Sequence, residues 1–272
     1  MTKNKKILIT GGLGFLGSYT IEKYKSKGYD ITIIDNLSTN TIDVSDPICK
    51  GCNVIIMDIL DYTWKKEDKF DMIIHLASPV GPAGILQHSG KLLVGDFEVR
   101  NEYSTAKLLG EIVISNTAKV SNLKYQIIRP FNISGARQLP DAGFVLPRFV
   151  TQALSGEDIT VFGDGEQLRA FTYVKDIIDG IYLASVHNKN DIWNIGNPAN
   201  KVSINYLANR VKELTNSKSD IIHIDPKTIY GPLYAEAWDK IPDPKKIQTS
   251  LDWQTTKNVD EIIKDVIEYW RS

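Results

Sequence analysis

Short apolar runs alternate with amphipathic segments through the first half of the chain. Five runs of about five residues, rich in isoleucine and valine, predict strands that are buried on both faces. Helical patterns lie between them, and this alternation is typical of a parallel sheet covered by helices. We therefore expect an α/β fold built on a doubly wound parallel sheet. The predicted strands are Lys6–Thr10, Ile31–Asp35, Asn53–Met57, Phe70–His75 and Tyr125–Arg129.

Two helices in this half have well-defined patterns. The segment Leu16–Lys27 carries apolar side chains on one face and lysines on the other, and Gly28 follows it as a helix-ending residue. The segment Tyr103–Val120 has an apolar face, and it places Lys107 and Glu111 one turn apart on another face.

Glycine and proline punctuate the chain more often after Pro130. We expect residues 1–130 to form one lobe and residues 131–272 a smaller α/β lobe packed directly on it. The cleft between two lobes is the default place for a binding site. The elements predicted in the second lobe are the helices Pro147–Leu154, Val174–Val186, Ile204–Thr215 and Val259–Trp270, and the strands Ile159–Phe162, Asp191–Ile195 and Ile221–Asp225.

Composition narrows the class of protein. The chain of 272 residues has 42% hydrophobic and 24% charged residues and a net charge of −1, as expected of a globular protein. The chain has no excess of basic residues of the kind that indicates nucleic-acid binding. It also has no run of about 18 apolar residues, which a membrane span would need. The apolar stretch after the first residues is broken at once by glycines, unlike a signal peptide. Because two cysteines are too few to cross-link a secreted fold of this size, we expect a cytoplasmic protein.

Three residues that could ligate a metal are better explained by structure. Cys49 and Cys52 have CxxC spacing, but no second pair completes a zinc site. His75 ends a predicted strand and is interpreted as a packing residue. No metal site is expected.

A glycine-rich segment, Thr10–Gly17, lies between the first predicted strand and the first predicted helix. Glycines in this position permit a tight turn and let the backbone approach a pyrophosphate at the helix N-terminus. Asp35 ends the second strand, where a carboxylate accepts hydrogen bonds from the ribose hydroxyls of NAD and repels the 2′-phosphate of NADP. The two features together predict an NAD site.

The pentapeptide Tyr103-Ser-Thr-Ala-Lys107 is the second chemical motif. A helix places residues i and i+4 on one face, so the lysine ammonium can lower the pKa of the tyrosine phenol. Such a phenolate is a general base that takes a proton from a hydroxyl while hydride leaves for nicotinamide. Tyr103 and Lys107 are therefore the candidate catalytic residues.

In these motifs the chain resembles the extended short-chain dehydrogenase/reductase family, and within it the NAD-dependent sugar-nucleotide epimerases and dehydratases. The resemblance implies a Rossmann-type NAD-binding lobe and a smaller C-terminal lobe that binds a nucleotide sugar. The segments that carry it are Thr10–Gly17, Asp35–Ser38, Asp58, His75–Ser78, Tyr103–Lys107, Arg129–Asn132 and Val161–Arg169.

The resemblance also implies roles for single residues. On the cofactor side these are Gly11, Leu13, Gly14, Phe15, Leu16 and Gly17 at the pyrophosphate, Asp35, Asn36 and Ser38 at the adenosine ribose, Asp58 and Ile59 at adenine, and Leu76, Ala77, Tyr103 and Lys107 beside the nicotinamide half. On the substrate side they are Asn132 at a phosphate, Leu146 and Phe149 at the nucleotide base, Phe162 and Arg169 at the nucleoside and diphosphate, and Lys240 where the family often carries an arginine. A guanidinium such as that of Arg169 binds phosphate through two parallel hydrogen bonds, which a lysine lacks.

One departure from the family lies between His75 and Tyr103. Only 27 residues separate them, whereas the family fits a crossover helix, a fifth strand with the catalytic Ser or Thr, and a loop there. We expect about 40 residues to be missing, by an internal excision between about Gly90 and Phe97, because a strand–helix–strand unit needs roughly 30 residues and the loop adds more. Loss of a central strand would expose ladder hydrogen bonds and apolar faces. Candidate replacements for the hydroxyl are Ser78, Ser89 and Ser104; the only apolar run available as a strand is Leu92–Val94.

The function that these features favour is NAD-dependent epimerisation of a nucleotide sugar, a UDP-hexose 4-epimerase acting through a transient 4-keto intermediate. A 4,6-dehydratase and a UDP-glucuronate decarboxylase are the alternatives, and the pentapeptide favours the epimerase over the decarboxylase. A third hypothesis is a nucleotide-binding protein with weak or no catalysis, because the hydroxyl donor is missing. A homodimer is possible, although the family builds it from the Tyr103 helix and the helix before it, which is absent here.

Overall fold

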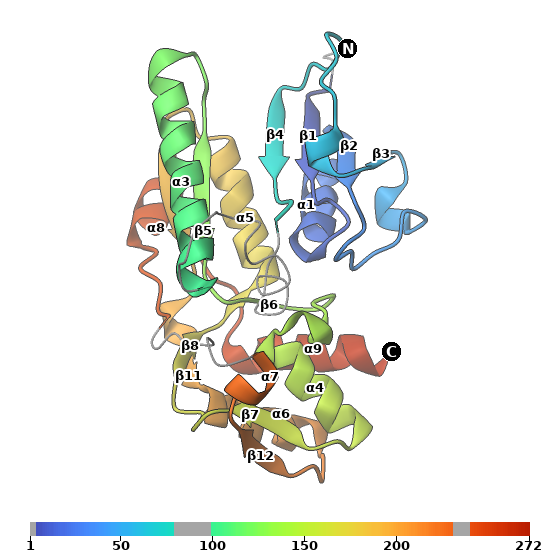
Figure 1. The fold of residues 1–272 in the computed structure, drawn as a ribbon, viewed down its shortest axis with the longest axis vertical. Helices are drawn as coiled ribbons and strands as arrows, with labels where there is room; N and C mark the ends of the chain where they lie inside the picture. Colours follow the sequence, from blue (N-terminus) through green and yellow to red (C-terminus); the bar gives the residue numbers. More distant parts are fainter. Residues whose placement is uncertain (1–3, 79–98, 231–239) are drawn as a thin grey trace. The chain divides into compact units, whose positions relative to one another are not determined.

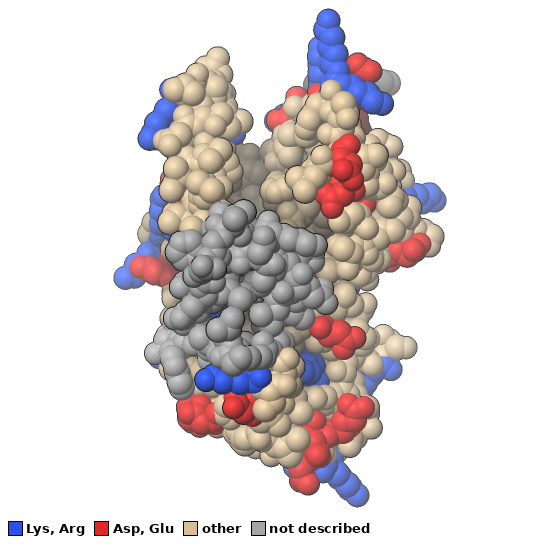
Figure 2. Space-filling model, in the orientation of Figure 1, with Lys and Arg blue, Asp and Glu red and all other residues tan. Residues whose placement is uncertain are grey.

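The computed structural model describes residues 4–78, 99–230 and 240–272, with the backbone alone for residues 99–103 and 230 (Figure 1). Ser89, Leu92–Val94 and the segment of the expected excision lie outside these residues. The chain divides into two compact units, Met1–Ser78 and Pro79–Ser272. In both units, lysine, arginine, aspartate and glutamate side chains are interspersed over the visible face (Figure 2).

The first unit is a parallel sheet of four strands in the order β3-β2-β1-β4. Helix α1 (Phe15–Ser26) packs against β1 and β2, and the apolar side chains of β1 are fully buried. Gly28 has a positive φ of 78°, as expected of the residue that ends a helix. The predicted α/β fold with a parallel sheet is confirmed. The strands are β1 (Lys6–Thr10), β2 (Asp30–Asp35), β3 (Asn53–Ile56) and β4 (Met72–His75), with single-turn helices η1 (Pro47–Cys49) and η2 (Ile59–Asp61).

The second unit holds the remaining elements. Its helices are α3 (Val99–Val120), η3 (Pro140–Ala142), α4 (Val145–Ser155), α5 (Val174–Ser185), η4 (Pro198–Asn200), α6 (Ile204–Thr215), α7 (Lys227–Tyr230), α8 (Lys245–Leu251) and α9 (Val259–Arg271). Its strands are β5 (Gln126–Pro130), β6 (Ile133–Ser134), β7 (Ile159–Phe162), β8 (Leu168–Ala170), β9 (Thr172–Tyr173), β10 (Asp191–Ile195), β11 (Lys201–Ser203) and β12 (Ile221–Ile224).

Four two-stranded pairings organise this unit: β5 with β10, β7 with β12 and β6 with β9 are parallel, and β8 with β11 is antiparallel. Helix α5 packs on β5 and β10, and helices α4, α6 and α9 pack on one another (Figure 1). Strand β5 thus lies in the second unit, although the sequence places the lobe boundary after residue 130; the functional division into lobes 1–130 and 131–272 stays a prediction.

Several predicted boundaries need correction. The second strand begins at Asp30, and the first helix runs from Phe15 to Ser26. The fourth strand begins at Met72 rather than Phe70, because Asp71 instead caps the start of β1 by accepting a hydrogen bond from the Lys6 N–H at 2.8 Å. The sequence did not predict β6, β8, β9, β11, α7 or α8. The other shifted ends are Ile56, Gln126, Pro130, Val99, Val145, Ser155, Ser185, Ile224 and Arg271.

Strands β4 and β5 each have one pairing partner in the part of the chain that the structure describes. Among the described residues, β4 pairs only with β1 and β5 pairs only with β10. On β4, Ile73 is 52% exposed, an unusual value for a parallel strand, which is normally covered on both faces. Both strands therefore present an open ladder edge in the described structure.

Candidate active site and cofactor site

The glycine turn after β1 is held against the end of β4. Gly11 has φ +69°, and a Cβ there would lie 2.8 Å from the Ala77 backbone nitrogen. The Thr10 hydroxyl accepts a hydrogen bond from the Ala77 N–H at 3.3 Å and contacts His75 Nδ1 at 2.7 Å. These contacts place Leu76 and Ala77 beside the turn, and they give His75 a structural partner.

The start of α1 is open for an anion. Gly14 is the N-cap residue, no side chain caps the helix, and its first turn has no acidic residue. A Cβ on Gly14 would meet only the Gly11 carbonyl oxygen at 3.5 Å and the Thr39 carbonyl oxygen at 3.9 Å. The backbone amides of Phe15 and Leu16 lie in this first turn, where a pyrophosphate is stabilised by the helix dipole.

Asp35 is buried, and it organises the turn. Its Oδ2 accepts a hydrogen bond from the Leu13 N–H at 2.9 Å, and its Oδ1 accepts one from the Leu37 N–H at 2.8 Å. Each carboxylate oxygen has a second lone pair, so the group can also accept hydrogen bonds from two ribose hydroxyls. The residues present therefore fit the adenosine half of NAD.

The other adenosine-side residues cluster at the ends of β2 and β3. Asn36 Nδ2 donates to Asp58 Oδ2 at 2.9 Å, and the Ser38 N–H donates to Asn36 Oδ1 at 3.1 Å. Asp58 also caps η2, which begins at the half-buried Ile59. The chain thus brings together, within one unit, the cofactor-side residues that precede Tyr103.

Helix α3 carries the candidate catalytic pair. It runs without a break from Val99 to Val120, so Tyr103 and Lys107 lie one turn apart on it. The Tyr103 side chain lies outside the described part of the structure. Although the Lys107 side chain is exposed over part of its surface, desolvation lowers the pKa of its ammonium. Ser104, one of the candidate hydroxyls, is exposed on the same helix, and Ser78 is half-buried at the end of the first unit.

Three of the substrate-side residues meet in the second unit. Asn132 Nδ2 donates to the carbonyl oxygens of Lys240 at 3.0 Å and Ala170 at 3.3 Å. The backbones of Arg169 and Lys240 form a parallel bridge, and Arg169 is only 8% exposed. The contact with Asn132 is therefore made by the Lys240 backbone, and the Lys240 ammonium is not used in it.

Leu146 and Phe149, the residues expected at the nucleotide base, lie in the core of the second unit. Both are buried, at 1% and 0% exposure, within α4. They contribute to the core of the second unit, and their role at the nucleotide base stays a prediction.

Phe162 ends β7 and has a partner that the sequence did not indicate. The Arg148 guanidinium carbon lies 3.9 Å from the centre of the Phe162 ring, a cation–π geometry, and Arg148 Nη2 donates to the Thr160 carbonyl oxygen at 3.1 Å. The sequence feature that could have indicated this contact is the presence of an arginine, Arg148, among the apolar residues of α4.

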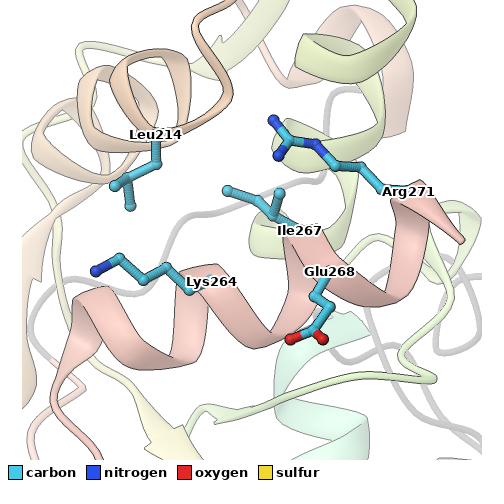
Figure 3. Close-up of a pocket in the computed structure, with 5 residues that line it drawn as sticks. All are labelled: Leu214, Lys264, Ile267, Glu268 and Arg271. Atoms are coloured by element: carbon cyan, nitrogen blue, oxygen red, sulfur yellow. The ribbon is translucent and has the colours of Figure 1, made fainter.

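A surface pocket of about 290 Å³ lies between α6 and α9, lined by Leu214, Lys264, Ile267, Glu268 and Arg271 (Figure 3). Leu214 and Ile267 approach each other across it, while Glu268 points away. None of the predicted site residues lines this pocket. It is separate from both clusters described above.

Comparison with protein families decides the class of the chain. Residues 7–90 and 80–196 match the model of the family described as "NAD dependent epimerase/dehydratase family". The chain belongs to this family. It is therefore an enzyme of the NAD-dependent nucleotide-sugar epimerase/dehydratase class, and NAD is its cofactor. Among the described residues, no helix is long and apolar enough to cross a membrane.

Relatives within the family differ in reaction. The chain is 28% identical to a UDP-N-acetyl-alpha-D-glucosaminuronate decarboxylase of Bacillus cytotoxicus, over 98% of each chain. It is also 28% identical to UDP-glucuronic acid decarboxylase 1 of Xenopus tropicalis, over 98% of this chain and 72% of the relative. Among solved structures, it is similar to a UDP-glucose 4-epimerase of Thermotoga maritima with UDP-glucose, with a TM-score of 0.80 and 25% identity over 98% of each chain.

These alignments agree with the expected shortage of residues. The alignment with the Bacillus relative runs over 316 positions, so at least 44 of them have no counterpart in a chain of 272 residues. The two segments that match the family meet at residues 80–90, next to the expected excision.

Proposed function

We propose that this family member oxidises C4 of a UDP-linked sugar with NAD and returns the hydride to the other face of the 4-keto sugar, as a UDP-hexose 4-epimerase. The observation that carries the proposal is the unbroken helix α3, which holds Tyr103 and Lys107 at the spacing that acid–base chemistry needs. The pentapeptide Tyr103–Lys107 supports the epimerase reaction over decarboxylation.

In this mechanism the Tyr103 phenolate takes the proton of the sugar O4–H as the C4–H bond breaks. The Lys107 ammonium stabilises the phenolate and holds the nicotinamide ribose. NAD, when bound, supplies the hydride acceptor and later the hydride donor. Arg169 holds the diphosphate, and Asp35 holds the adenosine ribose. Asn132 donates both amide hydrogens to the carbonyl oxygens of Lys240 and Ala170 and so holds the backbone beside Arg169. Proton return from Tyr103 to O4 completes the cycle.

A second candidate is decarboxylation of a UDP-hexuronate. It is supported by the Bacillus and Xenopus relatives, which both act as decarboxylases and align over 98% of this chain. Both reactions begin with the same C4 oxidation, so Tyr103 and Lys107 have the same role in each.

The test is a substrate panel. The purified chain with NAD is incubated with UDP-glucose, UDP-galactose, UDP-glucuronate and UDP-N-acetylglucosaminuronate. The products are separated by chromatography, which distinguishes epimers of equal mass, and their masses are measured by mass spectrometry. Interconversion of the first two supports the epimerase, whereas release of carbon dioxide from either uronate supports the decarboxylase. A 4-keto-6-deoxy product identifies a dehydratase. No turnover of any substrate by NAD-bound protein overturns the proposal in favour of a binding protein.

Two variants assign the chemistry. Tyr103→Phe and Lys107→Met should each lower kcat by at least about 100-fold, the usual contribution of general acid–base catalysis. Tyr206→Phe, at a half-exposed position on α6, is the matched control and should keep full activity.

We also propose a homodimer through α3. Leu108, Leu109, Ile112 and Val113 are each about half exposed along this helix, whose visible surface is largely uncharged (Figure 2). Leu109→Lys should convert a dimer to a monomer in light scattering, whereas Leu60→Lys, at a 91% exposed position in the first unit, should not. A wild-type monomer at micromolar concentration contradicts this assembly.

A further inference from the structure

Helix α3 is joined to strand β5 by an ion pair that the proposed reaction does not use. Arg129 Nε donates to Glu111 Oε1 at 2.8 Å, and Arg129 Nη2 donates to Glu111 Oε2. Both oxygens of one carboxylate are thus engaged by one guanidinium, the fork geometry in which such pairs are strongest. The Glu111 side chain is 18% exposed and the Arg129 side chain 46%, so the carboxylate is the better-shielded partner.

The position of Glu111 on α3 relates this ion pair to Lys107. Glu111 lies four residues after Lys107, and Tyr103 lies four residues before Lys107. Side chains at this spacing are neighbours on a helix surface. Lys107 therefore has two candidate partners in opposite directions along α3: the phenol that its proposed role requires, and a carboxylate that would draw its ammonium one turn away.

We propose that Arg129 is a positioning residue: by occupying both Glu111 oxygens, it prevents Glu111 from drawing the Lys107 ammonium away from Tyr103. The inference rests on the proposed function of Tyr103 and Lys107. It assigns a role to Arg129 through its contact with Glu111.

The electrostatics of the pair agree with this assignment. The hydrogen bonds that Arg129 donates to Glu111 raise the pKa of the Arg129 guanidinium, as expected of an ion pair. Desolvation lowers the pKa of Lys107, so an added carboxylate contact would oppose that shift. On the neighbouring strand β10 and on α8, Asp191 and Lys246 are paired with each other.

Rescue by a second substitution tests the proposal. Arg129→Met should lower kcat about tenfold or more, because Glu111 then pairs with Lys107. Adding Glu111→Gln to this variant should restore kcat to within about threefold of wild type, although the ion pair is still absent. Glu111→Gln alone should be nearly fully active. A double variant that stays as slow as Arg129→Met shows that the pair is only structural and overturns the proposal, as does a fully active Arg129→Met.

Two controls separate folding from positioning. Arg129→Lys keeps the charge but not the two parallel hydrogen bonds, so its kcat should lie between that of wild type and that of Arg129→Met. This variant serves as the test if Arg129→Met folds poorly. Lys246→Met breaks the ion pair between α8 and β10 and should leave kcat unchanged.

A readout independent of turnover uses Lys107 itself. Acetylation of the cofactor-free protein over a series of pH values, followed by peptide mass spectrometry, reports the pKa of the amine. The labelling midpoint should move to higher pH in Arg129→Met and return in the double variant; an unmoved midpoint contradicts the inference. If Tyr103→Phe instead stays fully active while the midpoint moves as expected, the proposed function fails and the role of the pair stands.

Discussion

Replacement of Gly17 by alanine tests how tightly the glycine turn is packed. A Cβ at Gly17 would lie 2.2 Å from the Gly11 carbonyl oxygen and 2.4 Å from that of Gly12, more than 1 Å inside ordinary contact. Both obstructing atoms are backbone, which cannot swing aside as a flexible side chain can. Overpacking costs about 1–3 kcal/mol, and we expect the upper end here, about 3 kcal/mol.

Thermal unfolding measures this loss. At about 2–4 °C per kcal/mol for a chain of this size class, Gly17→Ala should lower the Tm by about 6–12 °C in circular dichroism. NAD affinity, measured by titration calorimetry below the transition, should fall as well, because the turn that faces the pyrophosphate is displaced.

The matched control is Gly14→Ala in the same turn. Its Cβ would meet neighbours only at 3.5 and 3.9 Å, and Gly14 has an ordinary φ of −77°. We expect the free energy of unfolding to change by less than about 1 kcal/mol, while NAD affinity falls at least about tenfold because the methyl group lies where the phosphate approaches. If Gly17→Ala melts like wild type, or if Gly14→Ala binds NAD as tightly, the turn is not built as described.

Three further outcomes can be measured. Asn258→Ala removes the capping box in which Asn258 Oδ1 accepts from the Glu261 N–H and Glu261 Oε2 accepts from the Asn258 N–H; the expected loss is about 1 kcal/mol of unfolding free energy by urea titration, whereas Asn258→Asp should keep most of it. Arg210 holds the pKa of Asp260 below its ordinary value, so the ionised Asp260 stabilises the fold above about pH 4, and this contribution is lost as the pH falls through the lowered pKa. Asp260→Asn should therefore make the Tm less dependent on pH in the acid range. An unchanged pH dependence contradicts the pairing. Asp35→Asn should weaken NAD binding in calorimetry by about tenfold or more, and equal affinity would place the ribose elsewhere.

Local chemistry made the glycine turn and the helices predictable. The strand Ile159–Phe162 and the helix Ile204–Thr215 have the predicted bounds, because each has an uninterrupted pattern between clear turn residues. The glycine turn and Asp35 lie together because two adjacent parallel strands end there. In that part of the fold, the sequence motif was therefore enough to predict which residues lie together.

Contacts between distant parts of the chain could not be predicted in the same way. Strands β6 and β9 contain two residues each, too few for any periodicity, and they exist through their pairing alone. Asn132 meets the Lys240 backbone across 108 positions of sequence. The pairing of Glu111 with Arg129 likewise depends on how α3 lies along β5, which no local pattern reports.

The open edges of β4 and β5 have a consequence for the cooperativity of unfolding. Each described sheet is made from strands of one unit only, so each unit has hydrogen-bonded ladders of its own. Because ligand binding stabilises only the structure that forms its site, NAD should raise the unfolding temperature of the first unit more than that of the second. Ligand-dependent splitting of a single melting transition into two is therefore a physical signature of the shortened sheet.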